Sequence, residues 1–252
     1  MKIDELTFKL FLIWYFVGII LLTFDLIPPA LEWANVVFLI LSGLIGGIYF
    51  IKSFGLNLGL SLSLIIVFFS IFAEHIGVEY GLLFGDYYYT SDFGPKLIGV
   101  PIAIGFAWLM VIAGSHAISS VITKKQQFIP YTIIASLLAV LIDLVIDPVA
   151  YVVKNYWVWN AESFYYNIPM SNFIGWFIVA FILHSVIYIL SLKAKRTITI
   201  WHSRIVTVFF LVLAMFLLLS LFNGLWLAVF ITGFFSLITI FTYLRNRHHL
   251  FD

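Results

Sequence analysis

Long apolar runs, broken by short polar stretches, follow one another along the whole chain. A helix needs about 20 apolar residues to cross the hydrocarbon core of a bilayer, because each residue adds about 1.5 Å. Eight stretches meet this requirement, so the pattern predicts eight transmembrane helices. They cover residues 7–27, 34–52, 57–75, 98–120, 129–150, 171–192, 203–222 and 224–243.

The last two stretches are separated only by Asn223 and Gly224, a pair typical of a tight turn. They can form two complete helices, or one kinked or re-entrant unit that leaves seven spanning helices. In both cases the sequence predicts an all-α, polytopic membrane bundle. No internal repeat or low-complexity tract divides it, so residues 1–252 are predicted to form a single transmembrane domain.

Composition supports a membrane protein and excludes several kinds of chemistry. Hydrophobic residues make up 63% of the chain and charged residues 10%, against about 25% charged in a soluble domain. The net charge of +1 gives no basic surface for nucleic acid. There is no cysteine, and no two of the six histidines lie three or four residues apart on one predicted helix face. Disulfides, thiolate catalysis and a di-iron centre are therefore not expected, and we predict neither a metal nor a cofactor.

Lysine and arginine residues are concentrated on one side of the predicted membrane. Two of them, Lys96 and Lys154, fall on the other side, where most of the acidic residues also lie. Because basic loops usually stay in the cytoplasm, we expect a multi-pass protein of the cell membrane with both termini cytoplasmic. The eleven basic residues on the cytoplasmic side are Lys2, Lys9, Lys52, Lys124, Lys125, Lys193, Lys195, Arg196, Arg204, Arg245 and Arg247.

Two carboxylates interrupt the fifth predicted helix. Asp143 and Asp147 are four residues apart, so they lie on one helix face, one turn from each other. Asp143 is roughly 6–10 Å inside the predicted membrane at about 1.5 Å per residue, where a carboxylate usually marks a functional site. Two such neighbours cannot easily both ionise, which would leave one neutral acid. The alternative is structural: each aspartate binds a hydroxyl, a backbone amide or Lys154.

A second acidic group closes the third predicted helix. Glu74 and His75 lie at its outer end, and Glu79 follows after Gly77. These side chains could hold a proton or contribute to a metal site, although a metal normally needs three or four ligands in a defined geometry. A histidine bonded to a carboxylate and a carboxylate that caps the helix end are the structural alternatives.

Aromatic residues are concentrated in the predicted outer loops. Tryptophan and tyrosine belts are common at membrane interfaces, but Tyr87, Tyr88 and Tyr89 directly follow Asp86, which exceeds what a belt requires. An aromatic face stabilises a cation by about 0.5–2 kcal/mol. A neutral acid among aromatic faces is suited to forming and sheltering a carbocation.

Several blocks of sequence fall in and beside these loops, at 84–90, 94–101, 144–148, 157–159 and 165–176. In order and spacing they resemble the membrane carotenoid hydratases, the family of γ-carotene 1′-hydroxylase and bisanhydrobacterioruberin hydratase. The resemblance covers roughly residues 70–190. Residues 1–60 and 200–252 match the family only in hydropathy.

This resemblance implies an enzyme of carotenoid biosynthesis that adds water, without a cofactor, to the terminal carbon–carbon double bond of an acyclic carotenoid end. Such a hydratase, of the hydro-lyase type, forms a tertiary alcohol. The residues agree with this chemistry, because an acid can protonate the alkene and water can capture the tertiary cation. The expected partners are a lipid-soluble carotenoid, membrane lipids and other enzymes of the carotenoid pathway.

We assign roles to residues from their chemistry, since the resemblance supplies blocks rather than roles. Asp143 or Asp147 is predicted to be the catalytic acid, and Glu74 or Glu79 to position water or accept its proton. Lys96 and Asn172 are candidates for orienting a carboxylate. The predicted substrate-binding residues are Asp86, Tyr87, Tyr88, Tyr89, Lys96, Trp159 and Asn172.

Two other functions remain open. Another enzyme acting on isoprenoid or carotenoid ends, a cyclase or isomerase, would also begin with protonation. A proton-coupled membrane transporter would also bury acidic residues, although we find no inverted repeat of the kind such carriers contain.

Overall fold

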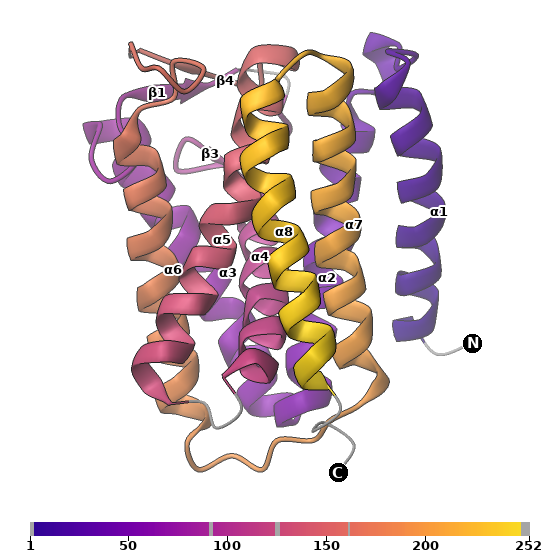
Figure 1. The fold of residues 1–252 in the computed structure, drawn as a ribbon, viewed down its shortest axis with the longest axis vertical. Helices are drawn as coiled ribbons and strands as arrows, with labels where there is room; N and C mark the ends of the chain where they lie inside the picture. Colours follow the sequence, from indigo (N-terminus) through magenta and orange to yellow (C-terminus); the bar gives the residue numbers. More distant parts are fainter. Residues whose placement is uncertain (1–2, 91–92, 124–126, 161, 248–252) are drawn as a thin grey trace.

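Eight long helices run side by side in the computed structural model, which describes residues 3–90, 93–123, 127–160 and 162–247 (Figure 1). All eight are long and apolar enough to cross a membrane. This confirms the predicted all-α bundle. The helices are α1 (Ile3–Thr23), α2 (Trp33–Phe54), α3 (Leu56–Tyr80), α4 (Ile102–Ile122), α5 (Phe128–Pro148), α6 (Met170–Ser191), α7 (Ile200–Phe222) and α8 (Trp226–Asn246).

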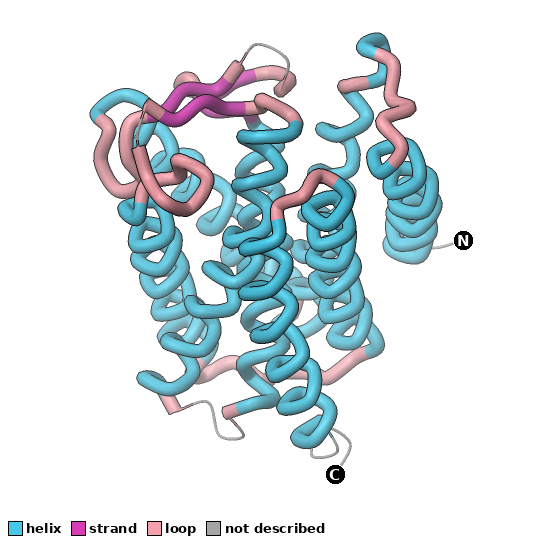
Figure 2. The backbone as a smooth tube through the Cα atoms, turned by 45° about the horizontal axis from the view of Figure 1, so that its top comes forward, coloured by secondary structure: helices cyan, strands magenta, loops and turns pink. Residues whose placement is uncertain are grey.

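Short strands in the loops cover one end of the bundle (Figure 2). Strand β1 (Tyr87–Tyr89) pairs antiparallel with β4 (Trp157–Trp159), so that Tyr87 lies opposite Trp159 and Tyr89 opposite Trp157. Strand β2 (Lys96–Leu97) pairs with β3 (Val100–Pro101). The hydropathy pattern did not predict these strands, which tie the loop after α3 to the loop before α6.

Three helix boundaries follow from local backbone chemistry. The first helix ends at Thr23, four residues earlier than predicted, because Asp25 adopts a left-handed conformation (φ 51°) and the Leu26 N–H bonds to the Leu21 carbonyl. The fourth begins only at Ile102, since Pro101 ends β3 and stands before the helix. Gly224 has φ 73°, which makes the turn between α7 and α8 and leaves two complete helices there.

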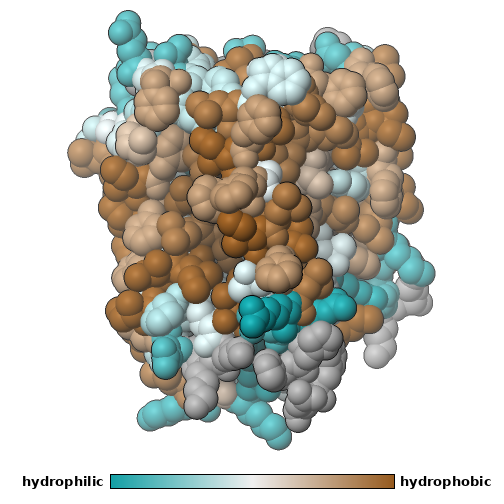
Figure 3. All heavy atoms as spheres, viewed as in Figure 1, coloured by the Kyte–Doolittle hydropathy of each residue, from teal (hydrophilic) through white to brown (hydrophobic). Residues whose placement is uncertain are grey.

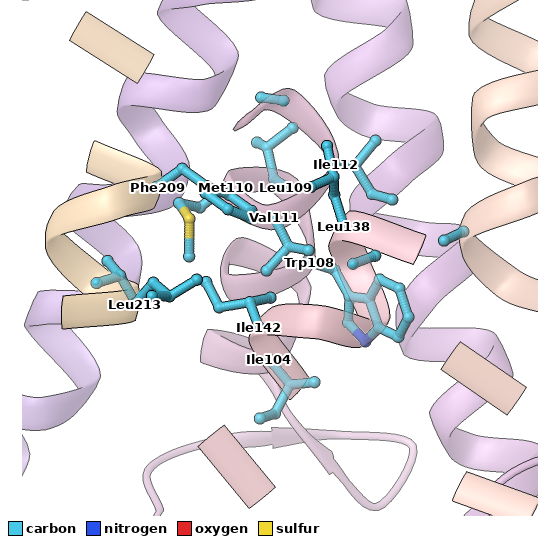
Figure 4. Packing of buried hydrophobic residues seen from close by; sticks show 14 of the residues in the cluster. Ile104, Trp108, Leu109, Met110, Val111, Ile112, Leu138, Ile142, Phe209 and Leu213 are labelled. Carbon is cyan, nitrogen blue, oxygen red and sulfur yellow. The ribbon is translucent and has the colours of Figure 1, made fainter. Parts of the chain in front are cut away.

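Helix α4 forms the centre of the bundle. In the most apolar 18-residue stretch of each helix, 83% of the residues are buried in α4, against 11% in α1 and 22% in α8. It packs against α2, α3, α5 and α7. Figure 4 shows this core, in which Met110 and Val111 of α4 lie near Ile142 of α5 and Phe209 of α7. The polar side chains described below are therefore held by a rigid apolar scaffold.

The outer surface divides into an apolar belt and two polar ends. Figure 3 shows hydrophobic residues around the middle of one face and hydrophilic residues above and below. Both ends of the described chain lie toward the same end of the bundle (Figure 1). The cytoplasmic location of that end stays a prediction. Three of the basic residues on which this prediction rests lie outside the described residues: Lys2, Lys124 and Lys125.

Candidate active site

A single amide holds the two aspartates of α5 together. Asp143 is completely buried and Asp147 almost so. Asn172, in the first turn of α6, donates through Nδ2 to Asp143 Oδ2 (2.9 Å) and to Asp147 Oδ2 (2.5 Å). Asp143 Oδ1 is buried without a hydrogen-bond partner among the described residues. Two acidic groups that share one donor in an apolar site are unfavourable as two full negative charges.

Glu74, near the end of α3, is surrounded by donors. Its Oε2 accepts hydrogen bonds from the Tyr87 hydroxyl and from the Tyr89 hydroxyl (2.9 Å), and its Oε1 accepts from Trp108 Nε1 (2.9 Å). Gly77, one turn further along α3, leaves room for this arrangement, because a Cβ there would lie 3.0 Å from the Tyr87 ring. Three donors fit a group that acts as an acceptor.

The two tyrosines are fixed as donors. Burial raises the pKa of Tyr87 and of Tyr89 well above the ordinary value, and the charge of Glu74 raises it further. Both phenols therefore keep their protons at physiological pH and continue to donate to Glu74.

Glu74 and Asp147 face one apolar cavity at this end of the bundle. It has about 1030 Å³ of empty volume, part of it open to the outside. Aromatic rings form much of the wall: Trp108 stacks on Trp176 at 3.9 Å, and Tyr87 lies 4.7 Å from Trp159 between ring centres. The Trp159 Nε1 donor is buried without a partner in the described part of the chain. The cavity thus combines acids, one free donor and π faces.

A small polar group borders the cavity near the start of α2. Asn35 donates through Nδ2 to the Tyr156 hydroxyl (2.6 Å), which donates to Glu32 Oε2 (3.2 Å). Burial, followed by the charge of Glu32, raises the pKa of Tyr156 far above its usual range, so this hydroxyl stays a donor. Lys154 also lines the cavity and reaches Asp25 (3.4 Å). The neighbouring lining residues Leu22, Phe38 and Leu39 are apolar.

The structure brings seven of the predicted site residues together. Six line the cavity and Asp143 lies behind, hydrogen-bonded to Asn172. The lining residues of this set are Glu74, Tyr87, Tyr89, Asp147, Trp159 and Asn172.

The structure leaves the other four predicted residues outside the cavity, exposed on the surface: Glu79, Asp86, Tyr88 and Lys96. Glu79 is five residues after Glu74, about 140° around a helix of 3.6 residues per turn. Tyr88 points outward because side chains alternate along β1. Asp86 accepts a hydrogen bond from Asn160 (3.2 Å), and Lys96 donates to the Tyr89 carbonyl (3.0 Å). These two side chains support the loops around the cavity.

Several lining residues were not predicted. Trp108 donates to Glu74 from inside α4, and Trp176 stacks on it from α6. Their signal was available, because tryptophan within an apolar span, away from the interface, is unusual. Asn35 looked like a polar residue at the start of the second predicted helix and Tyr156 like an interface aromatic, and only the fold places them beside the acids.

None of the histidines in the described part of the chain lines the cavity. His184 contacts Ser115 Oγ (3.0 Å) and the Tyr131 hydroxyl (3.3 Å), as expected for a core histidine with a polar neighbour. His75 contacts the Ile98 carbonyl (2.9 Å). Among the residues that the structure describes, no three histidine or carboxylate side chains are grouped so as to hold a metal ion.

Comparison with known protein families matches residues 34–239 to the family described as "Carotenoid biosynthesis protein". The chain belongs to this carotenoid biosynthesis family. The match covers most of the bundle, including every element that contributes to the cavity except the end of α1. Membership also implies a lipid-soluble substrate.

A relative in this family gives a more specific similarity. Bisanhydrobacterioruberin hydratase of Haloarcula japonica is 29% identical over 106 residues, which is 41% of this chain. The aligned region spans 36% of the length of that relative. No solved structure matches the chain.

Proposed function

We propose that this carotenoid biosynthesis protein is a hydratase that adds water to the terminal carbon–carbon double bond of an acyclic carotenoid end. The observation that carries the proposal is the pairing of Asp147 and Glu74 in one aromatic-lined apolar cavity. The similarity to a protein named as a hydratase points the same way.

Asp147 is the proposed acid because it lines the cavity, whereas Asp143 lies behind it. Its carboxyl proton goes to the less substituted alkene carbon, and the π electrons form the new C–H bond. The tertiary cation that remains lies among the faces of Trp108, Trp159 and Tyr87, each worth about 0.5–2 kcal/mol to a cation. A positioned acid of this kind contributes about 10²–10⁴-fold to a rate.

Water then completes the reaction. Its oxygen lone pair forms the C–O bond, and the oxonium proton passes to the carboxylate of Glu74 and returns through solvent to Asp147. The free Trp159 Nε1 donor is suited to orienting this water. Atoms balance as one alkene and one water giving one alcohol, with both carboxyl groups restored.

The origin of the new hydroxyl tests the proposal. The purified protein, in lipid with an acyclic carotene and without dioxygen or reductant, should form a product heavier by one water. In ¹⁸O-labelled water the tertiary alcohol should carry the label, and in deuterium oxide the neighbouring carbon should gain one non-exchangeable deuterium. An unlabelled alcohol or a strict need for dioxygen would reject hydration.

The same experiment separates the two rival functions. A cyclase or isomerase would change the carotene without any gain in mass. A transporter would leave the carotene chemically unchanged in every condition.

A further inference from the structure

A second apolar crevice lies between α1 and the start of α2, with α7 behind it. It has about 870 Å³ of empty volume, part of it open to the surroundings. Four residues line both this crevice and the acid cavity: Leu22, Asn35, Phe38 and Met215. The two spaces are therefore neighbours, separated by one largely apolar wall that these side chains form.

Specific contacts join α1 to α7 near both ends of α1. At one end Glu5 forms a two-pronged ion pair with Arg204 (2.7 and 2.8 Å), whose guanidinium lies over the Trp201 ring. At the other end Phe24 packs edge-on against Phe222 at 6.3 Å. These contacts hold α1 in place on either side of the crevice.

The middle of α1 is open where the crevice lies. Val17 is 53% exposed, and a Cβ built on Gly18 would have no atom within 4 Å. Both residues line the crevice, together with the indoles of Trp14 and Trp33. In lipid such an opening is filled by hydrocarbon, since it offers almost no polar partner.

We infer that this crevice holds the part of a long linear polyene that extends beyond the acid cavity, so that the substrate enters sideways from the bilayer between α1 and the start of α2. The inference rests on the proposed function, because it takes the acid cavity as the place of the reacting end. A carotene is much longer than its reacting end, and its remainder must continue through an apolar opening. The two spaces adjoin at Phe38 and Met215, which is where the polyene would pass from one to the other.

Filling the crevice tests the inference. Gly18→Trp adds a large side chain where the structure has empty space, and Gly233→Trp is the matched control, because its Cβ would also meet no atom within 4 Å. Gly233 belongs to α8 and lines neither space. The full-length proteins are purified from a host that makes lycopene, and bound lycopene and its hydrated product are measured per protein.

We expect Gly18→Trp to lower both bound lycopene and product about tenfold or more, which corresponds to at least about 1.4 kcal/mol of lost binding. Gly233→Trp should stay within about twofold of the parent protein, since its side chain does not enter the crevice. If Gly18→Trp does not fold, Gly18→Leu must show an intermediate loss. Normal lycopene binding and hydration in Gly18→Trp would overturn the inference.

The outcomes separate this inference from the proposed function. If the parent protein binds lycopene, Gly18→Trp loses it and neither protein forms the hydrated product, the crevice is a polyene site but the protein is not a hydratase. A hydrating Gly18→Trp protein that has lost only a co-purifying phospholipid would show that the crevice is a lipid site. A parent protein that neither binds nor hydrates lycopene contradicts both.

Discussion

At the scale of single residues, Asp143 and Asp147 have different positions although one amide holds both. Asp147 lines the cavity, while Asp143 is enclosed by protein and keeps one oxygen without a partner among the described residues. Under the proposed function, Asp147 touches the substrate and Asp143 acts through Asn172 as a positioning residue. This difference makes the two aspartates separable by experiment.

Asparagine at these two positions should give unequal losses of activity. Asp147→Asn keeps the shape and removes the acid, so kcat should fall about 10²–10⁴-fold. Asp143→Asn leaves the acid at the cavity and should cost about tenfold or less, comparable to one weakened hydrogen bond of 0.5–1.5 kcal/mol. Carotene turnover by protein with unchanged thermal unfolding measures both. Near-normal turnover by Asp147→Asn would show that another residue is the catalytic acid, and Glu74 would be the next candidate.

The sequence located this acid pair because a four-residue spacing on a helix has one geometric meaning. It left Glu74 and Glu79 equivalent, since the choice depends on where α3 stops and on which face meets the bundle. Tyr87 and Tyr89 were separable from Tyr88 only once the region was known to form a strand. Trp108 stood out as a tryptophan inside an apolar span, but nothing local links it to Glu74, 34 residues earlier.

At the scale of elements, the end of α5 shows how a proline is accommodated next to the acid. Pro148 has no N–H, so the carbonyl of Leu144, four residues earlier, loses its helical partner. The Tyr165 hydroxyl donates to that carbonyl at 2.5 Å. The chain then continues as a π-helix over Val149–Val153, which places Tyr156 and Trp157 beside the cavity.

Removing the Tyr165 hydroxyl should destabilise this junction. Tyr165→Phe leaves the Leu144 carbonyl without its donor and should cost about 1–3 kcal/mol, read as a lower thermal midpoint of the protein in detergent. Tyr80→Phe, at a largely exposed tyrosine, is the control. In the Pro148→Ala variant, the new backbone N–H at position 148 can donate to the Leu144 carbonyl. The loss of stability caused by Tyr165→Phe should therefore be smaller in that background. An unchanged effect there would contradict this account.

The elements that could be predicted from sequence are those set by length and hydropathy. Spanning helices satisfy their own backbone hydrogen bonds, so a long apolar run has few alternatives in lipid. The strands are different: β1 and β4 pair across about 70 residues, which local patterning does not encode. Their pairing nevertheless carries Tyr87, Tyr89 and Trp159 to the acids.

At the scale of the whole molecule, the two polar ends are chemically distinct. The candidate site lies where α3 and α5 end and α6 begins, under the paired strands (Figure 1). Basic residues such as Lys52, Lys193 and Arg245 belong to the opposite end, near both chain termini. The membrane orientation therefore decides from which side water and protons reach the acids.

We predict that both termini lie in the cytoplasm, because eleven basic residues fall on their side and two on the other. A periplasm-active phosphatase fused after Asp252 should be inactive, whereas the same enzyme fused after Asn223, one helix earlier, should be active; a cytoplasm-active fluorescent protein should give the reverse pattern. Activity of the phosphatase after Asp252 would contradict the prediction.

The predicted orientation puts Glu74 and Asp147 in the outer half of the membrane. A membrane-impermeant thiol reagent added from outside should therefore label a cysteine introduced at exposed Tyr88, which lies near these acids. The same reagent should not label a cysteine introduced at Lys193.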